Sequence, residues 1–161
     1  MPFILRLMRL IVVLSALPLG HSQAADTELL GVVSREAVAT GLPSFEEYYQ
    51  QYQSSPAEID AVKALAGKTL VVLFGAWCHD SQRELPRLLR TLDDAGVHLA
   101  DVQLLAVDRN KQEPSGRYRQ LQLRFTPTVI LFDGEQELGR VIEIPRHNWG
   151  SDLAALLNSA E

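Results

Sequence analysis

The chain has 161 residues, with 15 basic and 20 acidic side chains and a formal net charge of −5. An acidic chain without a basic stripe is a poor match for nucleic acid, whose phosphates bind lysine and arginine, so no nucleic-acid partner is expected. The only cysteine, Cys78, excludes an internal disulfide, and the thiol is therefore either free or shared with another molecule.

The first 24 residues have the parts of an export signal. Arg6 and Arg9 give a positive start, residues 10–19 form an apolar stretch, and residues 22–24 form a small-residue cleavage pattern. The apolar stretch is short for a membrane span. We therefore expect residues 1–24 to be a signal peptide whose removal leaves a periplasmic or secreted protein without a stable membrane anchor. An uncleaved N-terminal anchor is the alternative.

Residues 25–55 are expected to form an N-terminal extension with a short helix. Residues 26–42 show no clear hydrophobic period and are expected to lie over the surface. Ser44 and Glu47 then form a capping-box pattern that predicts a helix start. Four aromatic side chains follow at helical spacing, namely Phe45, Tyr48, Tyr49 and Tyr52. We expect this stripe to pack on the core, and a docking face for a partner is the alternative.

Residues 56–161 are expected to form one α/β domain. Ser55, Pro56 and Glu58 predict the start of a helix that runs to about Ala66. Continuous or mixed apolar runs predict strands at 69–74, 102–107, 128–132 and 137–144, and helical spacing predicts helices from about 82 to 94, from 116 to 123 and from 151 or 152 onward. The order βαβαββα, with one or two helices in front, predicts a mixed central sheet with helices on both faces.

Cys78 lies where the strand at 69–74 ends and a helix begins. The unpaired N–H groups and the macrodipole at a helix N-terminus favour negative charge. The thiolate is the reactive form of cysteine, so this position predicts a nucleophile. The alternative is a small buried apolar side chain.

Three features in this order resemble the thioredoxin-like family. They are Trp77-Cys78-x-x-Ser81 after a buried strand, Pro86 in the following helix, and Phe-Thr-Pro-Thr at residues 125–128 before the third strand. The resemblance covers most of the chain after the export signal. It implies a thioredoxin-like fold and thiol–disulfide exchange, isomerase-like in kind, with protein or peptide thiols and disulfides as partners.

The resemblance also implies roles for individual residues. Cys78 stands at the nucleophile, Ser81 at the second cysteine of the family motif, and Pro127 at a cis-proline beside the nucleophile. The backbone of Thr126 would pair with a substrate peptide as an added strand. Two sets of site residues are therefore expected, catalytic Cys78 and Ser81, and substrate-binding Trp77, His79, Thr126 and Pro127.

This sequence departs from the family pattern in ways that change the chemistry. Ser81 cannot form a disulfide, so the mixed disulfide on Cys78 would be resolved by an outside thiol, such as glutathione as co-substrate or a partner cysteine. Relatives that act as general reductases carry a buried Asp–Lys pair at the positions of Val72 and Leu104. A monothiol exchange protein is therefore expected rather than a fast general reductase.

Several alternatives remain open at this point. Ser81 with Glu84 also fits a capping box, so its hydroxyl could serve the helix rather than the thiol. His79 could be a solvated turn residue, Trp77 a packing residue, and the bond before Pro127 an ordinary trans bond. The whole chain could be a non-enzymatic peptide- or partner-binding module with an incidental Cys78, or a dimer linked through Cys78.

No metal or resident cofactor is expected. Cys78 and the histidines outside the export signal, His79, His98 and His147, lack a recognisable ligand spacing. No Gly-rich phosphate loop is present either.

Overall fold

The computed structural model describes residues 29–158, so the predicted signal peptide lies outside the described residues. The strands of this part of the chain are β1 (Gly31–Val33), β2 (Thr69–Phe74), β3 (Asp101–Ala106), β4 (Thr128–Asp133) and β5 (Gln136–Ile142). Its helices are α1 (Arg35–Gly41), α2 (Phe45–Gln51), α3 (Pro56–Lys63), α4 (His79–Ala95), α5 (Arg117–Gln120) and α6 (Trp149–Leu157). None of these helices is long and apolar enough to cross a bilayer.

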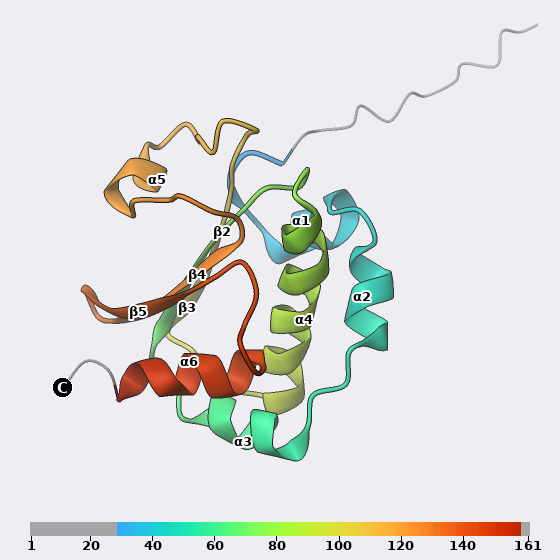
Figure 1. Cartoon of the computed structure of the whole chain (residues 1–161), viewed down its shortest axis with the longest axis vertical. Helices are drawn as coiled ribbons and strands as arrows, with labels where there is room; N and C mark the ends of the chain where they lie inside the picture. Colours follow the sequence, from blue (N-terminus) through green and yellow to red (C-terminus); the bar gives the residue numbers. More distant parts are fainter. Residues whose placement is uncertain (1–28, 159–161) are drawn as a thin grey trace, which may run out of the picture.

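One five-stranded sheet runs through the molecule in the order β1-β3-β2-β4-β5 (Figure 1). β2 and β3 are parallel and are connected through α4, as expected for a helical crossover. β4 is antiparallel to both β2 and β5, so the last two strands form the predicted hairpin. The chain therefore has the mixed α/β architecture that the sequence predicts.

The two faces of the sheet carry unequal cover. Leu70, Val72 and Phe74 of β2 belong to a large core shared with α1, α3, α4 and α6. Val71 and Leu73 point to the other face, where the smaller cluster includes Tyr118 of α5 and the residues that follow it. Figure 1 shows α5 on the opposite side of the sheet from α4. Because both faces of β2 are buried, its sequence reads as an unbroken apolar run.

The N-terminal extension is part of this core, and the prediction that residues 26–42 lie over the surface is wrong for the described residues. β1 pairs with the edge of β3, and Val38 of α1 is fully buried. A three-residue strand has too few positions to show a period, and its pairing with β3 is non-local. The capping box at Ser44 is also wrong, because Ser44 has a left-handed backbone and caps nothing with its side chain.

The aromatic stripe of α2 packs on α4, which confirms the core interpretation of that stripe. Phe45 is buried and stacks on Tyr49 with ring centroids 5.6 Å apart. The guanidinium groups of Arg87 and Arg90 lie 5.8 Å from the ring centroid of Tyr52 and 5.3 Å from that of Tyr49. Such cation–π contacts add to the buried area in holding α2 against α4.

Candidate functional site

Cys78 occupies the N-cap position of α4, directly after the turn that leaves β2. Its backbone is extended (φ −90°, ψ 122°), and its N–H donates to the carbonyl oxygen of Gly75 at 2.9 Å. Its side chain makes no capping hydrogen bond to the helix, and the residue is half-buried. The first-turn N–H groups of α4 therefore have no side-chain acceptor from Cys78, and the cysteine lies partly exposed at the N-terminus of the helix.

The Cys78 thiol lies against a loop 48 residues further along the chain. Its S–H donates to the carbonyl oxygen of Thr126 at 3.1 Å, and the Thr126–Pro127 peptide bond is cis. Thr126 is 3% exposed and Pro127 is buried, which fixes this loop beside the sulfur. The structure thus brings Cys78 together with Thr126 and Pro127, two expected site residues that are distant from it in the sequence.

Ser81 is fully buried in the first turn of α4, and its hydroxyl oxygen accepts the backbone N–H of Gly75 at 3.2 Å. The helix begins at His79, with Cys78 as N-cap, so the prediction of a helix start near Gln82 and the capping-box interpretation of Ser81 are both wrong. Ser81 ties the β2–α4 turn to the helix instead. This bond satisfies a buried N–H that would otherwise be unpaired.

Trp77 is fixed beside Cys78 and stays half-exposed. Its Nε1–H donates to the carbonyl oxygen of Val107 at 3.1 Å. Its ring covers Gly75 so closely that a Cβ there would come within 2.6 Å of the ring. The guanidinium of Arg109 lies 5.8 Å from the ring centroid. Trp77 therefore packs on the turn and also offers a rigid aromatic surface next to the thiol.

A chain of charged side chains follows the thiol along α4, and sequence reasoning missed it. His79 is exposed, while Asp80 is paired with Arg83 at 2.8 Å. Arg83 also contacts the buried carboxylate of Glu84 at 2.6 Å. The hydrogen bond to Glu84, opposed by burial and helped by the charges of Glu84 and Asp80, raises the pKa of Arg83. Arg83 thus offsets the negative charge of Asp80, two residues from the sulfur.

The interior beneath the site is apolar at the two positions where the family resemblance places an acid–base pair. Val72 and Leu104 are directly paired across β2 and β3 and are both buried. No titratable side chain can reach this place from either strand position. The interior beneath Cys78 therefore offers no acid–base pair at these two positions.

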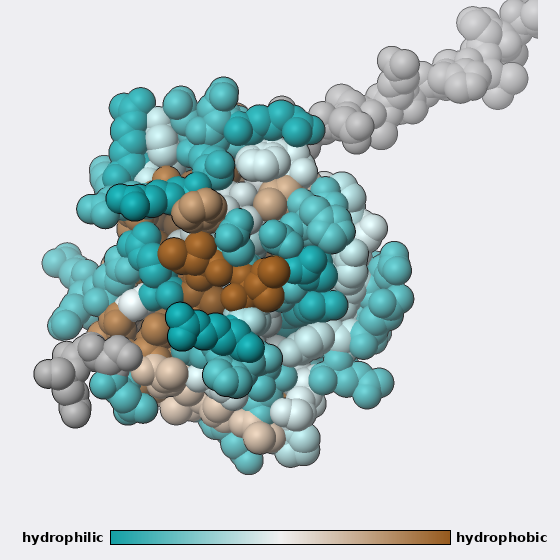
Figure 2. All heavy atoms as spheres, in the orientation of Figure 1, coloured by the Kyte–Doolittle hydropathy of each residue, from teal (hydrophilic) through white to brown (hydrophobic). Residues whose placement is uncertain are grey.

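An exposed apolar patch surrounds the cis-proline loop, and sequence reasoning missed it as well. Phe125, Ile142 and Ile144 are each about half exposed. Ile142 pairs with Thr128 in the β4–β5 ladder, and the N–H of Glu143 donates to the carbonyl oxygen of Pro127 at 2.7 Å. Figure 2 shows apolar side chains gathered in the middle of this face. The sequence pattern assigned Ile142 and Ile144 to the strand at 137–144, and only the tertiary fold places them beside Phe125 and Pro127.

Residues 29–158 contain no group of three or more His, Cys, Asp or Glu side chains placed to hold a metal ion. Cys78 and His79 are adjacent at the helix start, whereas His147 lies just before α6.

Comparisons with known proteins give information about the fold of the chain and none about its function. No protein-family model matches this sequence, and no curated protein matches it significantly. A solved structure of a protein of unknown function from Pseudomonas aeruginosa aligns with a TM-score of 0.59 and 17% identity, over 84% of this chain and 95% of that one. An HIV epitope scaffold aligns with a TM-score of 0.51 and 20% identity, over 84% and 86%.

Thioredoxins are also among the matches. Thioredoxin f2 from Chlamydomonas reinhardtii aligns with a TM-score of 0.41 and 15% identity, over 73% of this chain and 88% of that one. A likeness this distant adds no argument about function. The strand order and the helices show a mixed α/β fold built on one five-stranded sheet. What that fold does in this protein has to be argued from the residues around Cys78.

Proposed function

We propose that this protein carries out thiol–disulfide exchange through one nucleophilic cysteine, Cys78, on protein or peptide partners held beside Pro127. One observation carries the proposal: a half-buried cysteine occupies the N-cap position of a 17-residue helix, and its sulfur lies 3.1 Å from the Thr126 carbonyl oxygen. A helix N-terminus generally favours negative charge, and the attacking form of a cysteine is negatively charged.

The exchange would take place in two steps. The Cys78 thiolate attacks one sulfur of a partner disulfide, so a Cys78–partner S–S bond forms and the original S–S bond breaks. The leaving sulfur departs as a thiolate and takes a proton from water. A second thiol, from glutathione or a partner cysteine, then attacks the mixed disulfide and releases Cys78. Each step conserves the number of disulfides, so no separate oxidant is needed.

Ser81 has a positioning role in this proposal. It has no sulfur with which to displace the partner, so mixed disulfides on Cys78 should persist until an outside thiol arrives. Its bond to Gly75 holds the turn that carries Trp77 and the thiol. The hydroxyl of Ser81, in place of a second thiol, therefore explains both why Cys78 acts alone and how the turn is held.

The surroundings of the sulfur support the binding of an extended peptide. Trp77 and the exposed His79 flank the thiol on one side, and the backbone of Thr126 lies on the other. A partner strand could add to the backbone at Thr126. We further propose, from the export signal alone, that this exchange occurs in a periplasm or outside the cell, where disulfides persist.

The exposed apolar patch favours a second candidate function, a non-enzymatic module that binds a peptide or a partner. Contiguous apolar surface on a protein of this size commonly marks an interaction site. Phe125, Ile142 and Ile144 could hold a partner without any chemistry at Cys78. A dimer linked through Cys78 is a third candidate.

One experiment separates these functions. The mature chain is mixed with a peptide whose cysteine is disulfide-linked to glutathione, and intact masses are followed with time. We expect Cys78 to form an adduct with the peptide faster than free glutathione at equal concentration reacts with the same peptide. The adduct should decay when reduced glutathione is added. It should be absent from Cys78→Ser. Adducts no faster than those of free glutathione would overturn the exchange function. A mass of two disulfide-linked chains would favour the dimer.

A further inference from the structure

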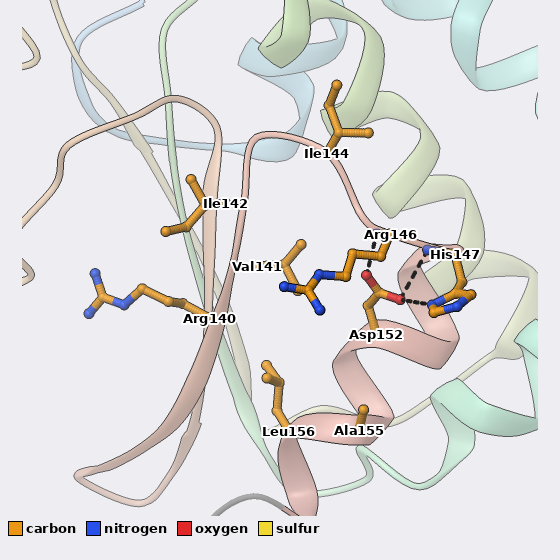
Figure 3. Close-up of a pocket in the computed structure, with 9 residues that line it drawn as sticks. All are labelled: Arg140, Val141, Ile142, Ile144, Arg146, His147, Asp152, Ala155 and Leu156. Atoms are coloured by element: carbon orange, nitrogen blue, oxygen red, sulfur yellow. Dashed lines mark hydrogen bonds and ion pairs between the residues drawn. The ribbon is translucent and has the colours of Figure 1, made fainter.

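A groove of about 490 Å³ lies between β5 and α6. We call it the β5–α6 groove. Its apolar lining includes Val141, Ile142, Ile144 and Leu156 (Figure 3). Arg146, His147 and Asp152 line it near the start of α6. The groove therefore offers an apolar surface with charged groups at one end.

The charged side chains in the groove differ in whether they have a partner among the described residues. Arg140 is paired with Glu137 at 2.6 Å, and its Nη1 donates to a backbone carbonyl oxygen. Asp152 accepts the backbone N–H groups of Arg146 and His147, and the Nδ1 atom of His147 lies 3.2 Å from its Oδ1 atom. Within residues 29–158 the guanidinium of Arg146 has no acidic partner, and Figure 3 shows it extended across the groove. One positive charge is left for a ligand.

The groove adjoins the loop that contacts the thiol. The thiol contacts the Thr126 carbonyl oxygen, and the carbonyl oxygen of the next residue, Pro127, accepts the N–H of Glu143 at 2.7 Å. Ile142 and Ile144, on either side of Glu143, both line the groove and are about half exposed. An extended peptide that crosses the thiol can therefore continue into the groove within a few residues, because each residue advances the chain by roughly 3.3 Å.

We propose that the β5–α6 groove binds the part of the partner polypeptide next to its reacting cysteine, with apolar side chains on Ile142 and Ile144 and a carboxylate on Arg146. This inference rests on the exchange function proposed above. A guanidinium and a carboxylate pair through two parallel hydrogen bonds, whereas a lysine at the same place in the partner would be repelled. The groove thus gives the exchange site a preference for partners that carry an acidic residue near the cysteine.

The test uses non-covalent binding, so that it does not depend on thiol chemistry. Full-length mature protein with Cys78→Ala is titrated into fluorescein-labelled nine-residue peptides of valine and alanine with a central serine in place of cysteine. Glu, Gln or Lys is placed three residues from the serine on both sides. Fluorescence anisotropy is expected to show about threefold tighter binding of the Glu peptide than of the Gln peptide, as exposed ion pairs give, and weaker binding of the Lys peptide.

Two variants assign this preference. Arg146→Gln should abolish the preference for the Glu peptide, and Arg119→Gln, which removes the same charge from α5 on the other face of the sheet, should leave it unchanged. Ile144→Ser should weaken the Glu and Gln peptides equally, because it removes apolar contact and no charge. The preference should also shrink in 1 M NaCl, which screens exposed ion pairs.

Each other outcome has its own meaning. Equal affinities for the three peptides, or a preference that survives Arg146→Gln, would overturn the groove inference even if wild-type protein still forms mixed disulfides. A Glu preference without mixed disulfides would overturn the exchange function and leave the groove as a binding site. Light scattering that shows a dimer, split by Ile144→Ser, would assign the groove to a second copy and overturn the peptide as occupant.

Discussion

The helix starts within residues 29–158 are of two kinds, because α1, α3 and α6 have a side-chain N-cap whereas α2, α4 and α5 have none. At the start of α1, α3 and α6 the N-cap side chain accepts a backbone N–H of the first helical turn. These N-cap residues are Ser34, Ser55 and Asn148 respectively. α4 is the longest helix of residues 29–158, yet it begins at Cys78, whose side chain makes no such bond. A conventional cap stabilises a protein by about 1 kcal/mol, and α4 lacks it.

The start of α4 has no side-chain cap, and two other hydrogen bonds fix it, one to the preceding turn and one to a distant loop. The Gly75 N–H bonds to the buried Ser81 hydroxyl, and the Cys78 thiol bonds to the Thr126 carbonyl oxygen. The comparison teaches that the turn is fixed by the fold while the N–H groups of the first helical turn stay available to a negative charge. That arrangement suits a reactive sulfur better than it suits helix stability.

The largest expected effect is on adduct formation, and it comes from giving α4 a conventional serine cap in place of Cys78. Cys78→Ser should remove every mixed disulfide, and as an N-cap it should raise the free energy of unfolding by about 1 kcal/mol relative to Cys78→Ala. Intact mass measures the first effect and urea unfolding the second. Equal stability of the Ser and Ala variants would show that the α4 start cannot use a cap, and the contrast with α3 and α6 would fail.

The next effect concerns the contact that replaces the cap. Ser81→Ala leaves the buried N–H of Gly75 without an acceptor and should lower the free energy of unfolding by about 1–3 kcal/mol. Ser54→Ala is the matched control, because the Ser54 hydroxyl makes only a long 3.4 Å bond to Thr91. Similar losses in the two variants, measured by urea unfolding, would mean that Ser81 does not hold the turn.

A smaller effect tests the conventional caps. Asn148→Ala should cost about 1 kcal/mol of unfolding free energy because Asn148 accepts the N–H of Ser151 at 2.8 Å. Ser44→Ala is the control, since Ser44 precedes α2 without capping it, and the change should stay within about 0.5 kcal/mol. If Ser44→Ala were as costly as Asn148→Ala, the cap bond would not be the source of the loss.

The smallest effect concerns α5, where a preceding carboxylate replaces the N-cap side chain. Glu113 accepts the N–H groups of Ser115 at 2.6 Å and Tyr118 at 3.2 Å. Burial acts to raise the pKa of Glu113, but hydrogen bonds from Ser115, Tyr118 and Arg117 outweigh it and lower that pKa below its ordinary value of 4.5.

A lowered pKa contributes stability that is present above the ordinary value and is lost as pH falls through the folded-state value. Thermal unfolding of Glu113→Gln should therefore depend less on pH than that of the wild type between about pH 5 and pH 3. Parallel pH curves for the two proteins would remove Glu113 as the anchor of this helix start.

Local sequence signals predicted the elements whose signals are local. β2 was predicted with its observed bounds because both of its faces are buried, and the cap of α3 at Ser55 was predicted from three neighbouring residues. The end of α4 was predicted at residue 94 and lies at Ala95, where Gly96 follows with a left-handed backbone. These features depend on residues within one turn or one strand.

The errors have the opposite origin. Ser81 followed by Glu84 has the pattern of a capping box, and only the position of Gly75 shows that its hydroxyl serves the preceding turn. β1 was missed because its partner β3 is distant in sequence, as the pairing of Gly31 with Ala106, 75 residues away (106 − 31), shows. At the site, the motif and the family resemblance predicted Cys78, whereas the apolar patch and the β5–α6 groove arise from packing between distant segments.

The most direct test of the central claim is the rate of Cys78 alkylation by iodoacetamide at pH 6.5, in the folded protein and in the same protein unfolded in urea. A helix N-terminus favours negative charge, and the folded chain should therefore react about tenfold faster. The unfolded chain carries the same thiol without the helix and is the internal control. A folded chain that reacts no faster than the unfolded one would contradict the account, and Cys78 would then be an ordinary packed side chain.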